Sequence, residues 1–296
     1  MGTVARGHRP MTRWLVTGAG GMLGRDLVAA LAGHEVVALT RAELDITDVA
    51  AVRAAVAEVE VVINTAAWTD VDGAETKADA AWAVNGHGAG VVANACSRAG
   101  VRLLHVSTDY VFAGSVAGDP AAAPGYREDD PTGPCTEYGI GKLAGEQSVL
   151  AQGGSVVRTA WLYGEHGRNF VRTMLTLESS REFLDVVDDQ WGQPTWTHDL
   201  AARLVALGTA DAAPGVFHIT GSGRTTWCGL ARAVFAAVGA DPERVRPTTT
   251  DKFPRPAPRP AFSVLGHDAM LAAGLDPMPP WADSVRAAVP LLITEG

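Results

Sequence analysis

The stretch that decides the fold of this chain runs Arg13-Trp14-Leu15-Val16-Thr17-Gly18-Ala19-Gly20-Gly21-Met22-Leu23-Gly24. An apolar run with β character ends in a glycine cluster, and a helical pattern of apolar residues begins at Leu23. Glycine has no Cβ and tolerates positive φ, so the backbone can turn sharply and approach a ligand closely. The N–H groups at the start of the following helix favour a diphosphate. This order predicts a dinucleotide site, and the alternative is a tight turn that binds nothing.

Alternating strand and helix patterns continue from this stretch to about residue 160. We expect strands at 34–39, 59–63, 101–107 and 156–161, with helices between them, including one over 78–95 and one that begins near Tyr138. The strand at 59–63 is a nearly continuous β-branched run, which is typical of a parallel sheet covered on both faces. The pattern predicts an α/β fold with a doubly wound parallel sheet of the Rossmann type.

Beyond residue 160 the pattern is less regular, with helices expected near 169–180, 197–208 and 226–238 and short strands at 184–187 and 215–219. We therefore divide the chain into an N-terminal extension (1–11), a dinucleotide-binding domain (12–160) and a mainly substrate-binding α/β lobe (161–296). In this division, some segments after residue 160 can belong to the first domain. The loop 113–136 is rich in Ala, Gly, Pro and acids, and its length suggests a functional lid or an insertion.

Composition narrows the classes of function. The 296 residues carry a net charge of −9, and only 19% are charged, so nothing indicates a surface for nucleic acid. No apolar run reaches the roughly 20 residues that span a bilayer, and the first residues lack the apolar segment of a secretory signal. Cys96, Cys135 and Cys228 have no paired spacing, so we expect buried apolar fillers without a disulfide or metal. The expected protein is soluble, reduced and cytoplasmic.

The residues after the second expected strand bear on the cofactor. A cofactor with a free 2′-hydroxyl is usually held by an acid about 20 residues past the glycines. Thr40 and Arg41 stand there, and an arginine suits a 2′-phosphate. We therefore expect NADPH and leave NADH open as a second cofactor. The alternative for Arg41 is a solvated loop cation.

A tyrosine and a lysine supply the expected chemistry. Tyr138 and Lys142 lie at i and i+4, on one face of a helix. A neighbouring cation favours a phenolate and lowers the pKa of a tyrosine. Such a pair can protonate a ketone oxygen as hydride reaches the carbon, or do the reverse. The alternative is a solvated lysine packed over a tyrosine ring.

These motifs together resemble the extended short-chain dehydrogenase/reductase superfamily and, within it, the dTDP-4-dehydrorhamnose reductase family. The resemblance covers nearly the whole chain after Met11. It rests on the stretches 16–24, 64–72, 107–112, 138–146, 158–164, 189–195 and 257–260, with Ser263. It implies NADPH-dependent reduction of the 4-keto group of a dTDP-4-dehydro-6-deoxyhexose, foremost dTDP-4-dehydro-L-rhamnose to dTDP-L-rhamnose.

The resemblance also implies roles for individual residues. Thr108 would hydrogen-bond the keto oxygen, Tyr138 would protonate it, and Lys142 would orient the cofactor ribose and tune Tyr138. The implied cofactor site comprises Gly18, Gly20, Gly21, Met22, Leu23, Gly24, Arg41, Asp45, Ile46, Ala66, Ala67, Tyr138 and Lys142. The implied substrate site comprises Val71, Thr108, Asp109, Trp161, Asn169, Gln190, Pro194 and Arg259, of which Arg259 would face the diphosphate. For Trp161 and Pro194 a packing role is the alternative.

Other functions stay open at this point. Trp68 stands where the family more often has tyrosine, and a sister 4-ketosugar reductase of deoxysugar biosynthesis shares the motifs. A nucleotide-sugar epimerase or dehydratase is a second alternative, although Tyr110 occupies the place where such dehydratases carry a glutamate. A noncatalytic NADP-binding regulatory subunit is the third. A homodimer is the expected assembly.

Overall fold

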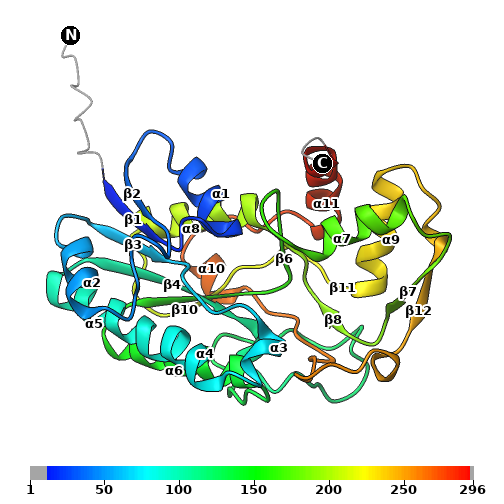
Figure 1. Ribbon diagram of the computed structural model, residues 1–296, viewed down its shortest axis with the longest axis horizontal. Helices are drawn as coiled ribbons and strands as arrows, with labels where there is room; N and C mark the ends of the chain where they lie inside the picture. Colours follow the sequence, from blue (N-terminus) through cyan, green and yellow to red (C-terminus); the bar gives the residue numbers. More distant parts are fainter. Residues whose placement is uncertain (1–11, 294–296) are drawn as a thin grey trace, which may run out of the picture.

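The computed structural model describes residues 12–293, so the expected extension over 1–11 lies outside the described residues. A six-stranded sheet forms the centre of one half of the molecule, and all its neighbouring strands run parallel (Figure 1). From edge to edge the strands are β10 (Val216–His218), β5 (Ser155–Thr159), β4 (Arg102–Thr108), β3 (Val61–Asn64), β1 (Arg13–Thr17) and β2 (Glu35–Leu39).

The strand order reverses beside β1. The chain passes from β1 to β2 on one side and then returns to β3 on the other side. In open parallel sheets, ligands bind outside the carboxyl ends of the strands where the order reverses. The doubly wound fold predicted from the sequence is confirmed.

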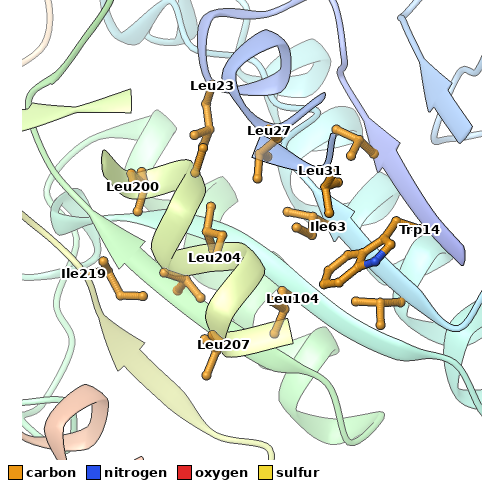
Figure 2. Packing of buried hydrophobic residues seen from close by; sticks show 14 of the residues in the cluster. Trp14, Leu23, Leu27, Leu31, Ile63, Leu104, Leu200, Leu204, Leu207 and Ile219 are labelled. Atoms are coloured by element: carbon orange, nitrogen blue, oxygen red, sulfur yellow. The ribbon is translucent and has the colours of Figure 1, made fainter. Parts of the chain in front are cut away.

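Helices cover both faces of this sheet because successive side chains of its strands point alternately into two cores. Trp14 and Val16 of β1 point into one core, whereas Leu15 points into the other. The first core is completed by leucines of α1 (Met22–Ala30) and α8 (Thr197–Thr209), which close over Trp14 and Ile63 in Figure 2. The second core lies under α2 (Val49–Val56), α5 (Ala89–Ala99) and α6 (Glu137–Ala151).

A third core organises the other half of the molecule, on the right of Figure 1. It packs α7 (Phe170–Glu178), α9 (Trp227–Ala237) and α11 (Trp281–Ile293) around Phe235 and Val289, beside the parallel pair β7 (Leu184–Val187) and β12 (Val245–Thr248). Two-residue strands form two further pairs, β6 (Leu162–Tyr163) with β9 (Thr195–Trp196) and β8 (Trp191–Gly192) with β11 (Thr225–Thr226). The remaining elements are α3 (Val71–Ala74), α4 (Ala78–Trp82), η1 (Ala83–Gly88), η2 (Asp109–Val111), η3 (Pro242–Arg244), η4 (Thr250–Lys252) and α10 (Asp268–Ala272).

Several segments beyond residue 160 belong to the first half in space. β10 joins the large sheet, α8 packs on α1, and α10 packs on β10. The division of the chain into domains at residue 160 stays a prediction. None of the helices within residues 12–293 is long and apolar enough to span a bilayer.

Three expectations need correction. The helix expected over 78–95 is α4 and α5 joined by the π-helical turn η1, in which Asn85 bonds both backbone groups of Trp68, at 2.9 and 3.0 Å. The loop 113–136 is not a lid: Tyr126 exchanges backbone bonds with Val264 and Gly266, and no residue of the loop lines the main cavity. Cys135 is exposed, so only Cys96 and Cys228 are buried fillers.

Candidate active site

A cavity of about 1570 Å³ opens at the carboxyl ends of β1 to β5. The sheet contributes the residues that follow its strands, among them Gly18, Thr40 and Thr65. The other half of the molecule contributes Trp227 and Arg255. The cavity is therefore where the reversal of strand order places a ligand site.

The glycine turn forms one wall. Gly18 has φ +68°, and a Cβ there would lie 2.8 Å from the backbone nitrogen of Ala66. Gly21 caps α1 without a side-chain hydrogen bond, so no side chain caps the first N–H groups of the helix. The cavity wall includes Gly20, Gly21 and Met22. A wall of bare backbone before a helix N-terminus fits the diphosphate of a dinucleotide.

The residues after β2 lie on the same wall. The carboxylate of Glu43 accepts bonds from the backbone nitrogen and hydroxyl of Thr40, at 2.9 and 2.8 Å, and these bonds lower its pKa. Asp45 accepts in the same way from Thr47. Arg41 is exposed and lines the cavity. The cation at this position supports the preference for a 2′-phosphate.

The floor of the cavity holds Thr108, Tyr138 and Lys142. Thr108 ends β4 and donates a 2.9 Å bond to Asp109, while Tyr138 lies on the first turn of α6 and hydrogen-bonds with Thr108. Lys142 follows one turn later, 2% exposed. The structure thus brings the three expected catalytic side chains to one place.

The pKa values on the floor are displaced mainly by burial. Burial raises the pKa of Tyr138 to about 12, against a hydrogen bond with Thr108 that lowers it, and Asp109 raises it further. Burial also raises the pKa of Asp109 to about 6 and lowers that of Lys142 to about 8. In the chain by itself, burial outweighs any lowering of the pKa of Tyr138; the lowering expected from Lys142 together with the positive nicotinamide ring stays a prediction. The phenol is protonated at neutral pH, which is the form that can donate a proton.

The amine of Lys142 has two partners in the sheet. Its Nζ donates a 2.7 Å bond to the carbonyl of Val106 and lies 3.3 Å from Nε2 of His105. Sequence reasoning missed His105 because a histidine inside an apolar strand carries no motif.

Aromatic rings form the opposite wall. Trp161 has φ +48° and stacks on Trp227, with ring centroids 3.6 Å apart and planes 7° apart. The ring centroids of Phe170 and Trp227 lie 4.6 Å apart. The indole of Trp161 also covers Gly192, where a Cβ would collide with it. A non-glycine residue in the left-handed region is held there by its surroundings. Trp161 was expected here, whereas Trp227 and Phe170 were missed, since in sequence they read only as apolar helix positions.

Arginines gather at the rim. Arg259 donates to Oδ2 of Asp72 at 2.9 Å and to the carbonyl of Ala257, and Arg255 approaches the same carboxylate at 4.0 Å. Burial acts to raise the pKa of Asp72, but the bond and charge of Arg259 hold it below its usual value. Arg168 also lines the cavity. Arg255 and Arg168 were missed, although the spacing of Arg255 and Arg259 in a proline-rich segment was a usable signal.

Most of the expected site residues line this one cavity. Those not yet located are Leu23, Gly24, Ile46, Ala66, Ala67, Val71 and Gln190, and all of them lie on its walls. Asn169 and Pro194 do not. Asn169 caps α7 through the backbone nitrogen of Arg172 and donates to the carbonyl of Gly164, and Pro194 is buried between β8 and β9 against Gly221. Their side chains serve local structure in the described part of the chain.

Comparisons with known proteins agree on one family. The model of the RmlD substrate binding domain matches residues 12–292. A dTDP-4-dehydrorhamnose reductase of Streptomyces griseus is 53% identical in an alignment 294 residues long that covers 96% of this chain and 95% of that protein. A dTDP-4-keto-6-deoxy-D-glucose reductase of Streptomyces niveus is 52% identical over 95% of this chain and 97% of its own. The crystal structure of dTDP-4-dehydrorhamnose reductase from Bacillus anthracis in complex with NADP superposes with a TM-score of 0.88, at 34% identity, over 97% of this chain and all of that one.

Proposed function

Because this chain belongs to the RmlD substrate binding domain family, we propose that it is an NADPH-dependent reductase of a dTDP-4-dehydro-6-deoxyhexose. The reaction converts the 4-keto group to an alcohol, with dTDP-4-dehydro-L-rhamnose as substrate and dTDP-L-rhamnose as product. The observation that carries the proposal is the meeting of Thr108, Tyr138 and Lys142 on the floor of a cavity whose wall is the glycine turn before α1.

The chain's own residues divide the work of the reaction. NADPH, when bound, supplies the hydride. The N-terminus of α1 would hold its diphosphate, and Arg41 would pair with the 2′-phosphate. Tyr138, protonated at neutral pH, gives its proton to the keto oxygen as that oxygen gains charge, and the hydroxyl of Thr108 hydrogen-bonds the same oxygen. Lys142 positions the ribose from its buried site on α6.

The substrate side is supported by charge and aromatic surface. A nucleoside diphosphate carries negative charge that Arg259 and Arg255 can meet at the rim, and guanidinium groups suit phosphate geometry. Trp161 and Trp227 offer flat apolar surface to a sugar or base ring.

A second sugar has nearly equal support. The relative from Streptomyces niveus acts, by its name, on dTDP-4-keto-6-deoxy-D-glucose, and it is 52% identical against 53% for the rhamnose enzyme of Streptomyces griseus. Both reactions reduce the same carbon and need the same acid. A dehydratase has weaker support because Tyr110 replaces its glutamate, and a regulatory subunit has no need of a Tyr–Lys pair on the cavity floor.

The test is a turnover panel. Purified protein is mixed with NADPH and each of several dTDP-4-keto-6-deoxyhexoses, oxidation of NADPH is followed by absorbance, and the product configuration is determined by NMR. We expect turnover with dTDP-4-dehydro-L-rhamnose. Binding of NADPH without turnover of any member would favour the regulatory subunit, and protein purified with stoichiometric oxidised NAD would favour an epimerase.

We also propose a cytoplasmic location and a homodimeric assembly. A cytoplasmic location is supported by the free thiols of Cys96, Cys135 and Cys228. A homodimer is supported by Trp82 and Ile140, which stand 51% and 44% exposed on α4 and α6. Sedimentation velocity of the wild type and of Ile140→Glu tests the dimer, which the substitution should dissociate.

A further inference from the structure

A row of buried polar side chains crosses the sheet beneath the cavity. Thr17 of β1, Asn64 of β3 and His105 of β4 are direct partners on neighbouring strands, so their side chains share one face of the sheet. They are 1%, 0% and 1% exposed. Buried polar groups are retained at a cost unless each finds a partner, so the bonds of the row are informative.

The row is continuous and ends at Lys142. Thr17 donates from its hydroxyl to Oδ1 of Asn64 at 2.6 Å, and Nδ2 of Asn64 lies 2.9 Å from Nδ1 of His105. Nε2 of His105, on the far side of the ring, lies 3.3 Å from Nζ of Lys142. The row therefore joins the strand before the glycine turn to the amine on the cavity floor.

The backbone sets the direction of these bonds. The N–H of Ala66 donates to Oδ1 of Asn64 at 3.2 Å, so this oxygen faces Ala66 and Thr17 and the amide NH₂ faces His105. Nδ1 of His105 must then accept, and the single proton of the neutral ring must be on Nε2. Burial and Lys142 both hold the pKa of His105 well below its usual value, which keeps the ring neutral. Nε2–H consequently points at the amine of Lys142.

We propose that His105 is a positioning residue for the reduction: locked by Asn64 in the tautomer with its proton on Nε2, it orients the amine of Lys142 and disfavours the ammonium form. An ammonium has three donors and no lone pair, so it cannot accept from Nε2–H, whereas a neutral amine accepts that bond and still donates to Val106. This inference rests on the proposed function only for its consequence in turnover.

The other charged or titratable groups near Lys142 do not explain a preference for its neutral amine. Glu146, one turn later on α6, acts to raise the pKa of the amine, and it is paired with Arg158 of β5 at 2.8 Å. Asp109 of η2, Tyr110 and Tyr138 share the cavity with the amine. The pKa of Lys142 is nevertheless lowered to about 8, chiefly by burial, in the direction that a facing N–H donor also favours.

The consequence for the reaction is that the N–H donor facing Nζ favours the neutral amine of Lys142, in the same direction as burial. Lys142 lines the same cavity as Tyr138 and follows it by one turn of α6, so a change in the charge of its amine acts within the catalytic site. The pH dependence of turnover should therefore respond to His105 and Asn64.

The experiment titrates Lys142 directly. The chain has three lysines, and Lys77 and Lys252 are exposed, so protein labelled with ¹³C at lysine Cε provides one buried signal and two internal references. Lys142→Met assigns the buried signal. His105→Gln can offer a carbonyl to the amine in place of the N–H, and Asn64→Leu frees the ring to move its proton to Nδ1. We expect the Lys142 midpoint to rise by about one pH unit in each variant.

A matched control and a second readout separate this role from packing. Ser155→Ala removes a buried hydroxyl of β5 that is outside the row, and it should leave the midpoint unchanged. With an active substrate, the limb of the pH–rate profile assigned to Lys142 should move by the same amount in His105→Gln. An unchanged midpoint in both row variants would overturn the proposal, whatever happens to kcat.

The wild type provides a test without any substitution. In protein labelled with ¹⁵N at histidine, the shifts of the ring nitrogens distinguish the two neutral tautomers. Protonated Nε2 at His105 supports the proposal, and protonated Nδ1 contradicts it even if the variants do not fold. Neither NMR measurement uses a substrate, so a failure of the proposed reductase function leaves them valid and distinguishable.

Discussion

The floor and the rim of the cavity hold their functional groups in different ways. On the floor, Thr108 and Lys142 are buried and the pKa values of Tyr138 and Lys142 are displaced. At the rim, Arg255 is exposed to water and Arg259 is paired with Asp72, and Arg41 on the cofactor wall is likewise exposed. Charge interactions are strong where water is excluded and weak where it screens them. We therefore assign chemistry to the floor and recognition to the rim, with a larger effect for each residue on the floor.

The largest effect is expected from Tyr138→Phe, which removes the acid from the floor and keeps the ring. General acid catalysis contributes about 10²- to 10⁴-fold, so kcat should fall by that amount while the Kd for NADPH stays the same. Stopped-flow reduction and fluorescence titration measure the two quantities. Thr108→Val should cost less because the proton source remains. A kcat of Tyr138→Phe within about threefold of the wild-type value would show that Tyr138 is not the acid of the reaction.

The next effect belongs to the rim. Arg259→Ala should raise KM for the sugar nucleotide roughly 30- to 150-fold. This corresponds to about 2–3 kcal/mol of binding free energy, as for the loss of a charged hydrogen bond. The Kd for NADPH should not change. Asp72→Asn keeps Arg259 but removes the carboxylate that holds it, so its KM should rise less. An unchanged KM in Arg259→Ala would return this arginine to a structural role.

Lys142 has an expected effect on stability with a defined sign. Its pKa is about 8 in the folded protein against an ordinary value of 10.5, so between these values the unfolded chain binds more protons and stability rises with pH. The free energy of unfolding of the wild type should gain up to about 3 kcal/mol relative to Lys142→Met from pH 8 to pH 10.5. Urea denaturation at several pH values measures it. Lys77→Met, at an exposed lysine, is the control, and a difference independent of pH would contradict the shift.

The smallest effect is expected at the exposed arginine of the cofactor wall. Arg41→Ala should weaken NADPH binding by about two- to fivefold, in the range of an exposed ion pair, and leave NADH binding nearly unchanged because only NADPH carries the 2′-phosphate. Calorimetric titration of both cofactors measures the ratio. An equal loss for both cofactors would show that Arg41 does not contact the phosphate.

Local spacing made much of this protein predictable from its residues. The run Arg13–Thr17 and the glycines after it specify a strand, a turn and a helix because backbone periodicity acts over a few positions. In the same way, Tyr138 and Lys142 must share a helix face once α6 forms. The fold class and most of the cavity wall follow from signals of this kind.

Packing between distant segments decided the rest. The partner of Arg259 is Asp72, 187 positions away, and the stack on Trp161 comes from Trp227 in another helix. Asn169 and Pro194 were expected in the substrate site, but Asn169 caps a helix and Pro194 lies in the connection between two strands. The row from Thr17 to His105 depends on the register of three strands, and the burial that displaces the pKa of Lys142 depends on the sheet beneath it. Register and burial arise from contacts along the whole chain, so no local pattern records them.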